Sequence, residues 1–271
     1  MSVVHRNKSL LITNRFHLQL YHYARGTYPA ADGSVTTMLV NRCLIPLGST
    51  DAEESFVSDE NQYYPMRPGC AYFIPAFHKA GVKLTENMRF LSIQFLLDFY
   101  NGIDVFSSFR QIMEIEDPTI TQRANEAFEI ESPYQLAPRL HSVVFDFVSR
   151  IFEKTDVDKL NLDVLLLPSF QDLNRLSETC TAATTVAELA DLCGVCRDTF
   201  SRTFIRKNGI SPKQFLNRCI LHRAYTLLSA GDMKVNEVAK ELHFTNEFYF
   251  SRFFKKHTGF SPKQFRRVYG H

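Results

Sequence analysis

The feature that most constrains the fold of this 271-residue chain is an internal repeat in its last third. The sixteen residues Phe200–Phe215 recur as Phe250–Phe265, and ten of the sixteen positions are identical. Upstream, Val186–Ala190 matches Val235–Ala239 at an offset of forty-nine, so the second copy holds one extra residue before the common segment. A period of about fifty residues indicates one supersecondary unit built twice.

Each copy predicts two helices joined by a turn. In the first copy, apolar residues recur at helical spacing as far as Cys193, and Gly194 suits a helix C-terminus. The next helix is expected over Arg197–Lys207, with Phe200 and Phe204 facing inward. The pattern is typical of helix-turn-helix units.

The second helix of each copy has a stripe of exposed positions, which is the surface that an inserted helix offers to base edges. Arginine can contact guanine with two hydrogen bonds, and an aromatic edge can touch a thymine methyl group. The candidate DNA-contacting residues are Arg197, Asp198, Ser201 and Arg202 in the first copy, and Asn246, Glu247, Phe248, Ser251 and Arg252 in the second.

The repeated Gly-x-Ser-Pro-Lys-Gln-Phe segment predicts the end of one helix and the start of another. Gly209 and Gly259 end the recognition helices, and each following Ser-Pro pair caps the next helix. The first of these later helices is expected over Pro212–Ser229, and its length sets the distance between the units. The candidate phosphate-contacting residues are Lys213, Lys256 and Lys263.

The charge distribution supports a polyanionic partner for this region alone. Residues 186–271 hold 15 Lys and Arg against 7 Asp and Glu, a net charge of +8, whereas the rest of the chain carries −6. Only the basic C-terminal part is therefore expected to meet nucleic acid.

Residues 184–267 resemble the DNA-binding domain of the AraC/XylS family of bacterial regulators. The motif that carries the resemblance runs from Val235 to Arg266 and includes Val-x-Glu-Val-Ala and Tyr-Phe-Ser-Arg-x-Phe-Lys-Lys-x-x-Gly-x-Ser-Pro. Two positions depart from the family pattern: His243 replaces a usual glycine, and Ile220 replaces a usual arginine, for which Arg218 or Arg223 is expected to compensate.

The acidic front part predicts short strands separated by turn residues. The expected strands are Leu10–Ile12, His17–Tyr23, Val35–Ile45, Ala71–Ile74 and Phe90–Leu97. The segment Met66–His78 resembles the Pro-Gly-Asp…Pro-x-x-x-His segment of the cupin-like barrels that serve as sensor domains in the same family. The fold class is therefore predicted to be α+β, with an N-terminal cupin-like β-barrel and a C-terminal all-α domain.

A small-molecule pocket inside the barrel is preferred to an enzyme site. Cupin enzymes bind metal through a His-x-His pair, but Lys79 and Ala80 follow His78, so no metal, cofactor or catalytic residue is expected. The candidate ligand-binding residues, chosen because they share strand parity or lie at a strand end, are Thr36, Arg42, His78, Phe90, Ser92 and Gln94. Thr36 and Arg42 are placed on one strand.

Two helices are expected between the barrel and the repeat. Pro138–Phe152 has a broad apolar face, which either pairs two subunits or packs on the barrel, and a second helix is expected over Leu160–Leu176. The predicted domains are a sensor over 1–135, a helical segment over 136–176, a polar linker over 177–185 and the DNA-binding domain over 186–271.

The six cysteines do not suggest a disulfide framework, because the N-terminus has no apolar secretory signal and a cytoplasmic (nucleoid-associated) location is expected. Cys193-Gly-Val-Cys196 has the spacing of redox and zinc sites, but neither a second ligand pair nor a βαβ context accompanies it. We interpret Cys193 as a buried helical residue and Cys196 as a turn residue.

These observations predict a ligand-responsive, sequence-specific transcription regulator that is not an enzyme. The family resemblance implies promoter DNA, a small-molecule effector such as a sugar or another metabolite, RNA polymerase and a second copy of the chain as partners. No membrane partner is expected, because no stretch approaches the roughly 18–20 consecutive apolar residues that a membrane span needs. The resemblance also favours transcriptional activation. The alternative is a constitutive DNA-binding regulator whose barrel is only a dimerisation scaffold.

Overall fold

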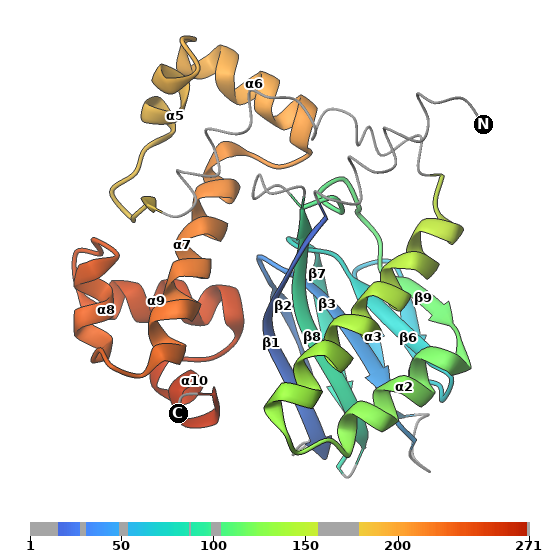
Figure 1. Ribbon diagram of the computed structural model, residues 1–271. Helices are drawn as coiled ribbons and strands as arrows, with labels where there is room; N and C mark the ends of the chain where they lie inside the picture. Colours follow the sequence, from blue (N-terminus) through green and yellow to red (C-terminus); the bar gives the residue numbers. More distant parts are fainter. Residues whose placement is uncertain are drawn as a thin grey trace. The chain divides into compact units, whose positions relative to one another are not determined.

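The computed structural model describes six ranges of the chain, which fall into two compact units (Figure 1). The described residues are 16–27, 31–48, 54–86, 88–98, 104–156 and 179–269. One unit comprises residues 19–96 and 109–159, and the other comprises the remaining residues. Within the described ranges, none of the helices combines the length and apolar character needed to cross a membrane.

The first unit contains two β-sheets and two helices. The five-stranded sheet has the order β1 (His17–Thr27), β8 (Arg89–Asp98), β3 (Asn41–Pro46), β6 (Cys70–Ile74) and β9 (Met113–Glu116). The four-stranded sheet has the order β2 (Ala31–Thr37), β7 (Lys79–Leu84), β4 (Phe56–Ser58) and β5 (Tyr63–Pro65). The α+β class agrees with the prediction, but the described strands form two separate sheets and not a closed barrel.

The predicted strand Val35–Ile45 is wrong, because the chain changes sheets within it. Thr36 lies on β2 and Arg42 lies on β3, which belong to different sheets. The change occurs at Met38–Val40, where the carbonyl of Met38 accepts a hydrogen bond from the amide of Phe77 (2.7 Å). This apolar run contains no glycine or proline to mark the bend. Predicted strand Leu10–Ile12 lies outside the described residues.

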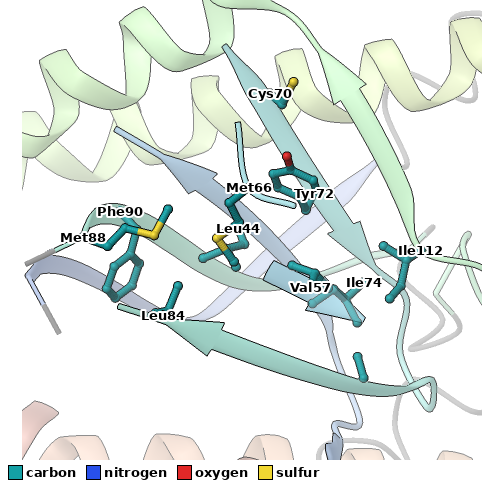
Figure 2. Packing of buried hydrophobic residues seen from close by; sticks show 11 residues of the cluster. Leu44, Val57, Met66, Cys70, Tyr72, Ile74, Leu84, Met88, Phe90 and Ile112 are labelled. Atoms are coloured by element: carbon teal, nitrogen blue, oxygen red, sulfur yellow. The ribbon is translucent and has the colours of Figure 1, made fainter. Parts of the chain in front are cut away.

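An apolar cluster between the two sheets forms the core of this unit (Figure 2). It takes alternate residues from β3, β6 and β8 of one sheet and meets residues of β4 and β7 from the other. Its buried members include Leu44, Tyr72 and Phe90 on the first sheet and Val57 and Leu84 on the second. Because strand side chains alternate, the neighbouring residues of β3, β6 and β8 point to the opposite face.

Two helices, α2 (Pro118–Phe128) and α3 (Pro133–Lys154), cover that opposite face (Figure 1). The apolar side of α3 is buried within the chain, and the Phe147 ring lies 6.1 Å from the ring of Phe73 on β6. Of the two alternatives for the predicted helix Pro138–Phe152, packing on the sheet therefore accounts for the apolar pattern. The predicted helix Leu160–Leu176 lies outside the described residues.

The C-terminal region consists of six helices between residues 186 and 269. They are α5 (Val186–Leu192), α6 (Arg197–Asn208), α7 (Pro212–Ala230), α8 (Val235–Glu241), α9 (Glu247–Thr258) and α10 (Pro262–Tyr269). The helices predicted over Arg197–Lys207 and Pro212–Ser229 are confirmed, each to within one residue. Helices α5 and α6 form the first helix-turn-helix unit, and α8 and α9 form the second.

The sequence repeat reappears as a repeated packing arrangement. The rings of Phe204 and Phe215 lie 5.6 Å apart, and their counterparts Phe254 and Phe265 lie 5.4 Å apart. Tyr225 of α7 packs edge-on against both rings of the second pair, at 5.5 and 5.0 Å. Helix α7 thus contributes an aromatic side chain to each unit.

The repeated Ser-Pro-Lys-Gln segment forms the same capping box in both copies. Ser211 Oγ accepts from the amide of Gln214 (3.2 Å), and Gln214 Oε1 accepts from the amide of Ser211 (2.8 Å). Ser261 and Gln264 repeat these bonds at 3.2 and 2.9 Å. The predicted serine caps are confirmed. In both copies the glutamine stands three residues after the serine because its side chain accepts from the serine amide.

Ile220, one of the two departures from the family pattern, and Arg223, which was expected to compensate for it, have distinct roles on α7. Ile220 is buried, 2% exposed, so it acts as a core residue. Arg223 Nη1 donates to the carbonyls of Thr179 (3.2 Å) and Cys180 (2.8 Å), and Arg223 Nη2 pairs with Glu241 (3.5 Å). Arg223 therefore ties the entry of this region to α7 and α8.

His243 occupies a left-handed backbone conformation, with φ 55°, immediately after α8. Its counterpart Gly194 has φ 65°. We expect His243→Gly to raise the free energy of unfolding by about 1 kcal/mol, because a side chain in this conformation is strained. His243→Ala is the matched control, since it removes the imidazole but keeps a Cβ. Urea unfolding of the full chain should rank the glycine variant above the alanine variant, and the reverse order would contradict the assignment of strain.

Candidate nucleic-acid interface and effector pocket

The first recognition stripe lies on α6. Arg197, Asp198 and Arg202 are exposed and Ser201 is half-buried, whereas Phe200 on the opposite side of the helix is 6% exposed. The Nε atom of Arg202 lies 3.4 Å from the carbonyl oxygen of Asp198, one turn earlier. The structure therefore brings all four predicted residues to one side of the helix.

The second recognition stripe occupies the matching positions of α9. Asn246 caps the helix by accepting from the amide of Tyr249 (2.9 Å), while Glu247 and Ser251 are half-buried. The Phe248 side chain is 79% exposed, so it does not belong to the core. Arg252 is exposed and lies 5.8 Å from the centre of the Tyr249 ring.

A basic groove of about 500 Å³ brings together residues of α7 and α9. Its lining includes the predicted residues Lys213, Arg252 and Lys256, together with Asn217 and Tyr249. Tyr249 was not among the predicted contact residues, because it falls between the stripe positions, although its aromatic character was a signal. Three cations converging on one hollow suit a polyanion.

The predicted lysine Lys263 lies in a separate hollow from that groove. This hollow also contains Glu247, Lys234 and Arg266. Lys263 stands in the first turn of α10, as Lys213 does in α7, because the two belong to the same repeated segment. Their side chains are both exposed.

The candidate ligand residues lie mainly between the two sheets of the first unit. A cavity of about 10 Å³ is lined by Thr36, Arg42 and His78, with apolar neighbours such as Met38 and Ile74. This volume has room for about one water molecule. Although Thr36 and Arg42 lie on different strands, the structure still brings them together.

Arg42 is held at the inner face of the five-stranded sheet. Its Nε donates to Ser92 Oγ (2.9 Å), and its backbone lies opposite Gln94 on β8 and Ile74 on β6. Ser92 and Gln94 are both buried. A guanidinium here is surrounded mainly by apolar side chains and can form strong, charge-assisted bonds to an anionic oxygen.

His22 of β1 is a neighbour of Arg42 that the sequence did not identify. Burial, together with the positive charge of Arg42, lowers the pKa of His22 to about 3. The imidazole is therefore neutral at neutral pH, and the positive charge of this pair resides on Arg42. The strand containing His22 was predicted, but its pairing beside β8 depends on a long-range contact with no local sequence signal.

His78 is positioned by a carboxylate. Its Nε2 lies 3.0 Å from Asp59 Oδ2, and Asp59 Oδ1 accepts from the amides of Asn61 and Gln62 (2.8 Å each). Burial raises the pKa of Asp59, but the bonds from these amides and from His78 outweigh it and hold the pKa below its ordinary value. Phe90, the remaining candidate, is 1% exposed in the apolar core (Figure 2).

Comparison with known proteins places the C-terminal region among helix-turn-helix domains. Residues 189–268 match the family model described as a helix-turn-helix domain. Over 94 residues the chain is 34% identical to the uncharacterized transcriptional regulator YijO of Escherichia coli K12, covering 35% of this chain and 33% of YijO. Over 79 residues it is 29% identical to the transcriptional activator RhaS of Escherichia coli O1:K1, covering 29% of this chain and 28% of RhaS. The chain thus spans about a third of the length of these relatives.

The fold of the whole chain is similar to that of ToxT from Vibrio cholerae. An apo ToxT variant gives a TM-score of 0.59 at 10% identity, covering 94% of this chain and 98% of ToxT. A ToxT structure with a bound unsaturated fatty acid gives 0.55 at 14% identity, covering 92% and 94%. The likeness supports a sheet-containing N-terminal domain followed by a helical C-terminal domain.

The Asp59–His78 contact predicts a specific loss of stability in acid. A carboxyl group whose pKa is lower in the folded state stabilises the protein above its unfolded pKa of about 3.8, and this contribution disappears as the pH falls through the folded pKa. Asp59→Asn should therefore be less stable than wild type at pH 7, and the difference should shrink only as the pH falls below 3.8 and through the lower folded pKa. Urea unfolding across this range tests the prediction, and a difference independent of pH would contradict it.

Proposed function

Because its C-terminal domain is a helix-turn-helix domain of the AraC/XylS type, we propose that this chain is a ligand-responsive, sequence-specific transcription regulator. Helices α6 and α9 each enter the major groove and read base edges. The sheet-containing N-terminal unit binds an effector. Activation is the expected output, with RNA polymerase as the downstream partner and a second copy of the chain at the promoter.

The observation that carries the DNA-binding proposal is the recurrence of one exposed stripe on two structurally equivalent helices. Both stripes end in an Arg residue, Arg202 and Arg252, with the inward phenylalanines two residues earlier and two later. Helix α7, which joins the units, has 19 residues and is therefore about 28 Å long. Two recognition helices joined by such a spacer suit successive major-groove segments, which are about 34 Å apart.

The individual residues have different expected roles. Arg202 and Arg252 are proposed to contact guanine, and the exposed Phe248 to contact a thymine methyl group. Lys213, Lys256 and Lys263 are proposed to neutralise backbone phosphates, which fix the position of the protein on the duplex without reading its sequence.

The effector best supported by the pocket is a small metabolite that carries an anionic oxygen group, such as a sugar acid or another carboxylic acid. Arg42 supplies the positive charge, and the apolar cluster beside it accommodates carbon. The ligands bound in two ToxT structures, an unsaturated fatty acid and a naphthalenyl butenoic acid, are both carboxylic acids. Binding would shift the population between two arrangements of the regulator only if the effector prefers one of them.

The scaffold alternative is favoured by one observation, the small size of the cavity beside Arg42. A volume of about 10 Å³ does not hold a sugar or a fatty acid, so an effector must open the space between the sheets. A constitutive regulator would need no such opening. The two functions therefore differ in whether any small molecule stabilises the first unit.

Base reading by the two arginines predicts a loss confined to specific DNA. After selection of a preferred site from random DNA, Arg202→Ala and Arg252→Ala should each weaken binding to that site by about 1–3 kcal/mol and leave binding to random DNA nearly unchanged. Titration of labelled duplexes with the full chain measures both affinities.

Lys263→Ala is the matched control for this experiment. It should weaken binding to specific and random DNA equally and reduce the slope of log affinity against log salt by about one. If either arginine variant behaved like the lysine variant, its role would be a phosphate contact, and the proposed base contact would be wrong.

An effector held by Arg42 predicts a thermal shift that depends on this side chain. At a hundred times its dissociation constant, an acid that binds the wild type should stabilise it by about 2.7 kcal/mol. Arg42→Met should abolish the shift, and Arg42→Lys should keep part of it, because lysine retains the charge but not the paired donors. A full shift in Arg42→Met would exclude Arg42 from the pocket, and no shift with any sugar or carboxylic acid would favour the scaffold alternative.

A further inference from the structure

Cys193 and Cys196 flank the turn between α5 and α6. Cys193 is the C-cap of α5 and Cys196 is the N-cap of α6. Both side chains are exposed, and neither forms a disulfide. This corrects the prediction that Cys193 is buried: the buried residues of α5 are Leu189 and Ala190, and Cys193 is exposed like Leu192 before it, whereas its counterpart Leu242, also a helix C-cap, is 0% exposed.

Cys196 stands where a better capping residue is expected. Its counterpart Asn246 accepts a hydrogen bond from the amide of Tyr249 through a carbonyl oxygen, whereas Cys196 meets the equivalent Thr199 amide only through sulfur, a weak acceptor. Thiols are not among the preferred N-caps, which are Ser, Thr, Asp and Asn. Thr185, Ser211 and Ser261 begin other helices of this region with oxygen caps. The cysteine is therefore not explained by helix stability.

The surroundings of Cys196 favour its thiolate form. The Cys196 thiol donates to the Thr199 hydroxyl oxygen (3.1 Å), and the hydroxyl and the amide of Thr199, which can both donate to a thiolate, lower the pKa of the thiol. The helix N-terminus acts in the same direction. An exposed cysteine with a lowered pKa is the nucleophile that oxidants meet first.

The turn between α5 and α6 places Cys193 only three residues before Cys196 in the sequence. Only Gly194 and Val195 separate the cysteines, and Gly194 adopts the left-handed conformation, φ 65°. The amides of Gly194 and Val195 donate to the carbonyls of Asp191 (3.0 Å) and Ala190 (3.1 Å), which folds the turn back on α5. The spacing is that of redox-active Cys-x-x-Cys sites.

The other four cysteines differ from this pair in being buried, although a hydrogen bond with Cys219 lowers the pKa of the Cys180 thiol. Cys43, Cys70, Cys180 and Cys219 are buried. Burial raises the pKa of the Cys43 thiol well above its ordinary value, and a hydrogen bond with Cys180, together with burial, does the same for Cys219. An oxidant in solution therefore reaches the pair at the turn before it reaches the others.

We propose that Cys193 and Cys196 form a reversible disulfide when the protein meets hydrogen peroxide, and that this modification weakens DNA binding by the first helix-turn-helix unit. The Cys196 thiolate attacks one peroxide oxygen, the O–O bond breaks, and water leaves after protonation, which gives a sulfenic acid. The Cys193 sulfur then attacks the Cys196 sulfur and expels the hydroxyl group as a second water. The two thiols lose two electrons in total, and the peroxide gains them.

The effect on DNA binding follows from the position of the bond. A disulfide requires Cα atoms about 4.4–6.8 Å apart and a dihedral angle near 90°, so it fixes the end of α5 against the start of α6. Arg197 and Asp198, the first two stripe residues, follow Cys196 directly. This regulatory step rests on the proposed DNA-binding function, whereas formation of the disulfide does not.

The test uses the reduced full chain treated with one equivalent of hydrogen peroxide, denatured, alkylated and digested with trypsin. The peptide covering residues 176–197 contains Cys180, Cys193 and Cys196. It should carry three alkyl groups before oxidation and one after it, and fragmentation should place the remaining group on Cys180. The proposal would be overturned if the peptide still carried three alkyl groups after oxidation. It would also be overturned if Cys180 lost its alkyl group while Cys193 and Cys196 kept theirs.

DNA affinity is measured on the same samples. Oxidation should weaken binding to the selected site about tenfold, a typical size for a coupled regulatory effect, and dithiothreitol should restore it. Cys193→Ser should bind normally when reduced and fail to form the disulfide, while Cys180→Ser should respond like the wild type. A disulfide that leaves the affinity unchanged would overturn the regulatory step, whereas a reduced protein that selects no DNA site would contradict the proposed function and leave the alkylation result standing.

Discussion

Aromatic packing at both ends of helix α7 is the interaction on which the arrangement of the two helix-turn-helix units depends. Near its start, Phe215 meets Phe204 of the first recognition helix, and further along Tyr225 meets Phe254 and Phe265 of the second unit. Because close-packed interiors transmit displacement instead of absorbing it, the two recognition helices are held by one rigid spacer. The spacing of the exposed stripes is therefore a property of α7 and of its buried contacts.

The two faces of the five-stranded sheet in the N-terminal unit have different surroundings. The face covered by α2 and α3 is closed by apolar packing, including the contact of Phe73 with Phe147. The inner face carries polar groups at one end, where Arg42 bonds to Ser92, and an apolar cluster further along the same strands. A charged group can be kept in such a place because hydrogen bonds offset part of its desolvation. Strand alternation is what allows one sequence to build both surfaces.

Local signals in the sequence predicted the C-terminal region closely, and long-range contacts explain what was missed elsewhere. Glycines, serine caps and the duplicated pattern mark the ends of α6 and α7, so their bounds follow from neighbouring residues. The bend at Met38–Val40 has no such mark, and the short strands β4, β5, β7 and β9 are defined by their partners. The neighbours His22 and Asp59 likewise depend on strand pairing and on a loop, neither of which periodicity reveals. Parity did place Phe90, Ser92 and Gln94 on one face of β8, because alternation within a strand is local, whereas the meeting of Ser92 with Arg42 depends on the register of β3 against β8.

Arg223 has a mechanical consequence for the way the chain enters its DNA-binding region. Arg223 donates to the carbonyls of Thr179 and Cys180 and also pairs with Glu241. The amide of Ala182 donates to the carbonyl of Leu242 (2.9 Å). Residues 179–182 are thus bonded to the second helix-turn-helix unit before the chain enters the first one at α5. A displacement of residues 179–182 would therefore act first on α7 and α8, so the two helix-turn-helix units are coupled unequally to the entering chain, although their sequences are copies of one another.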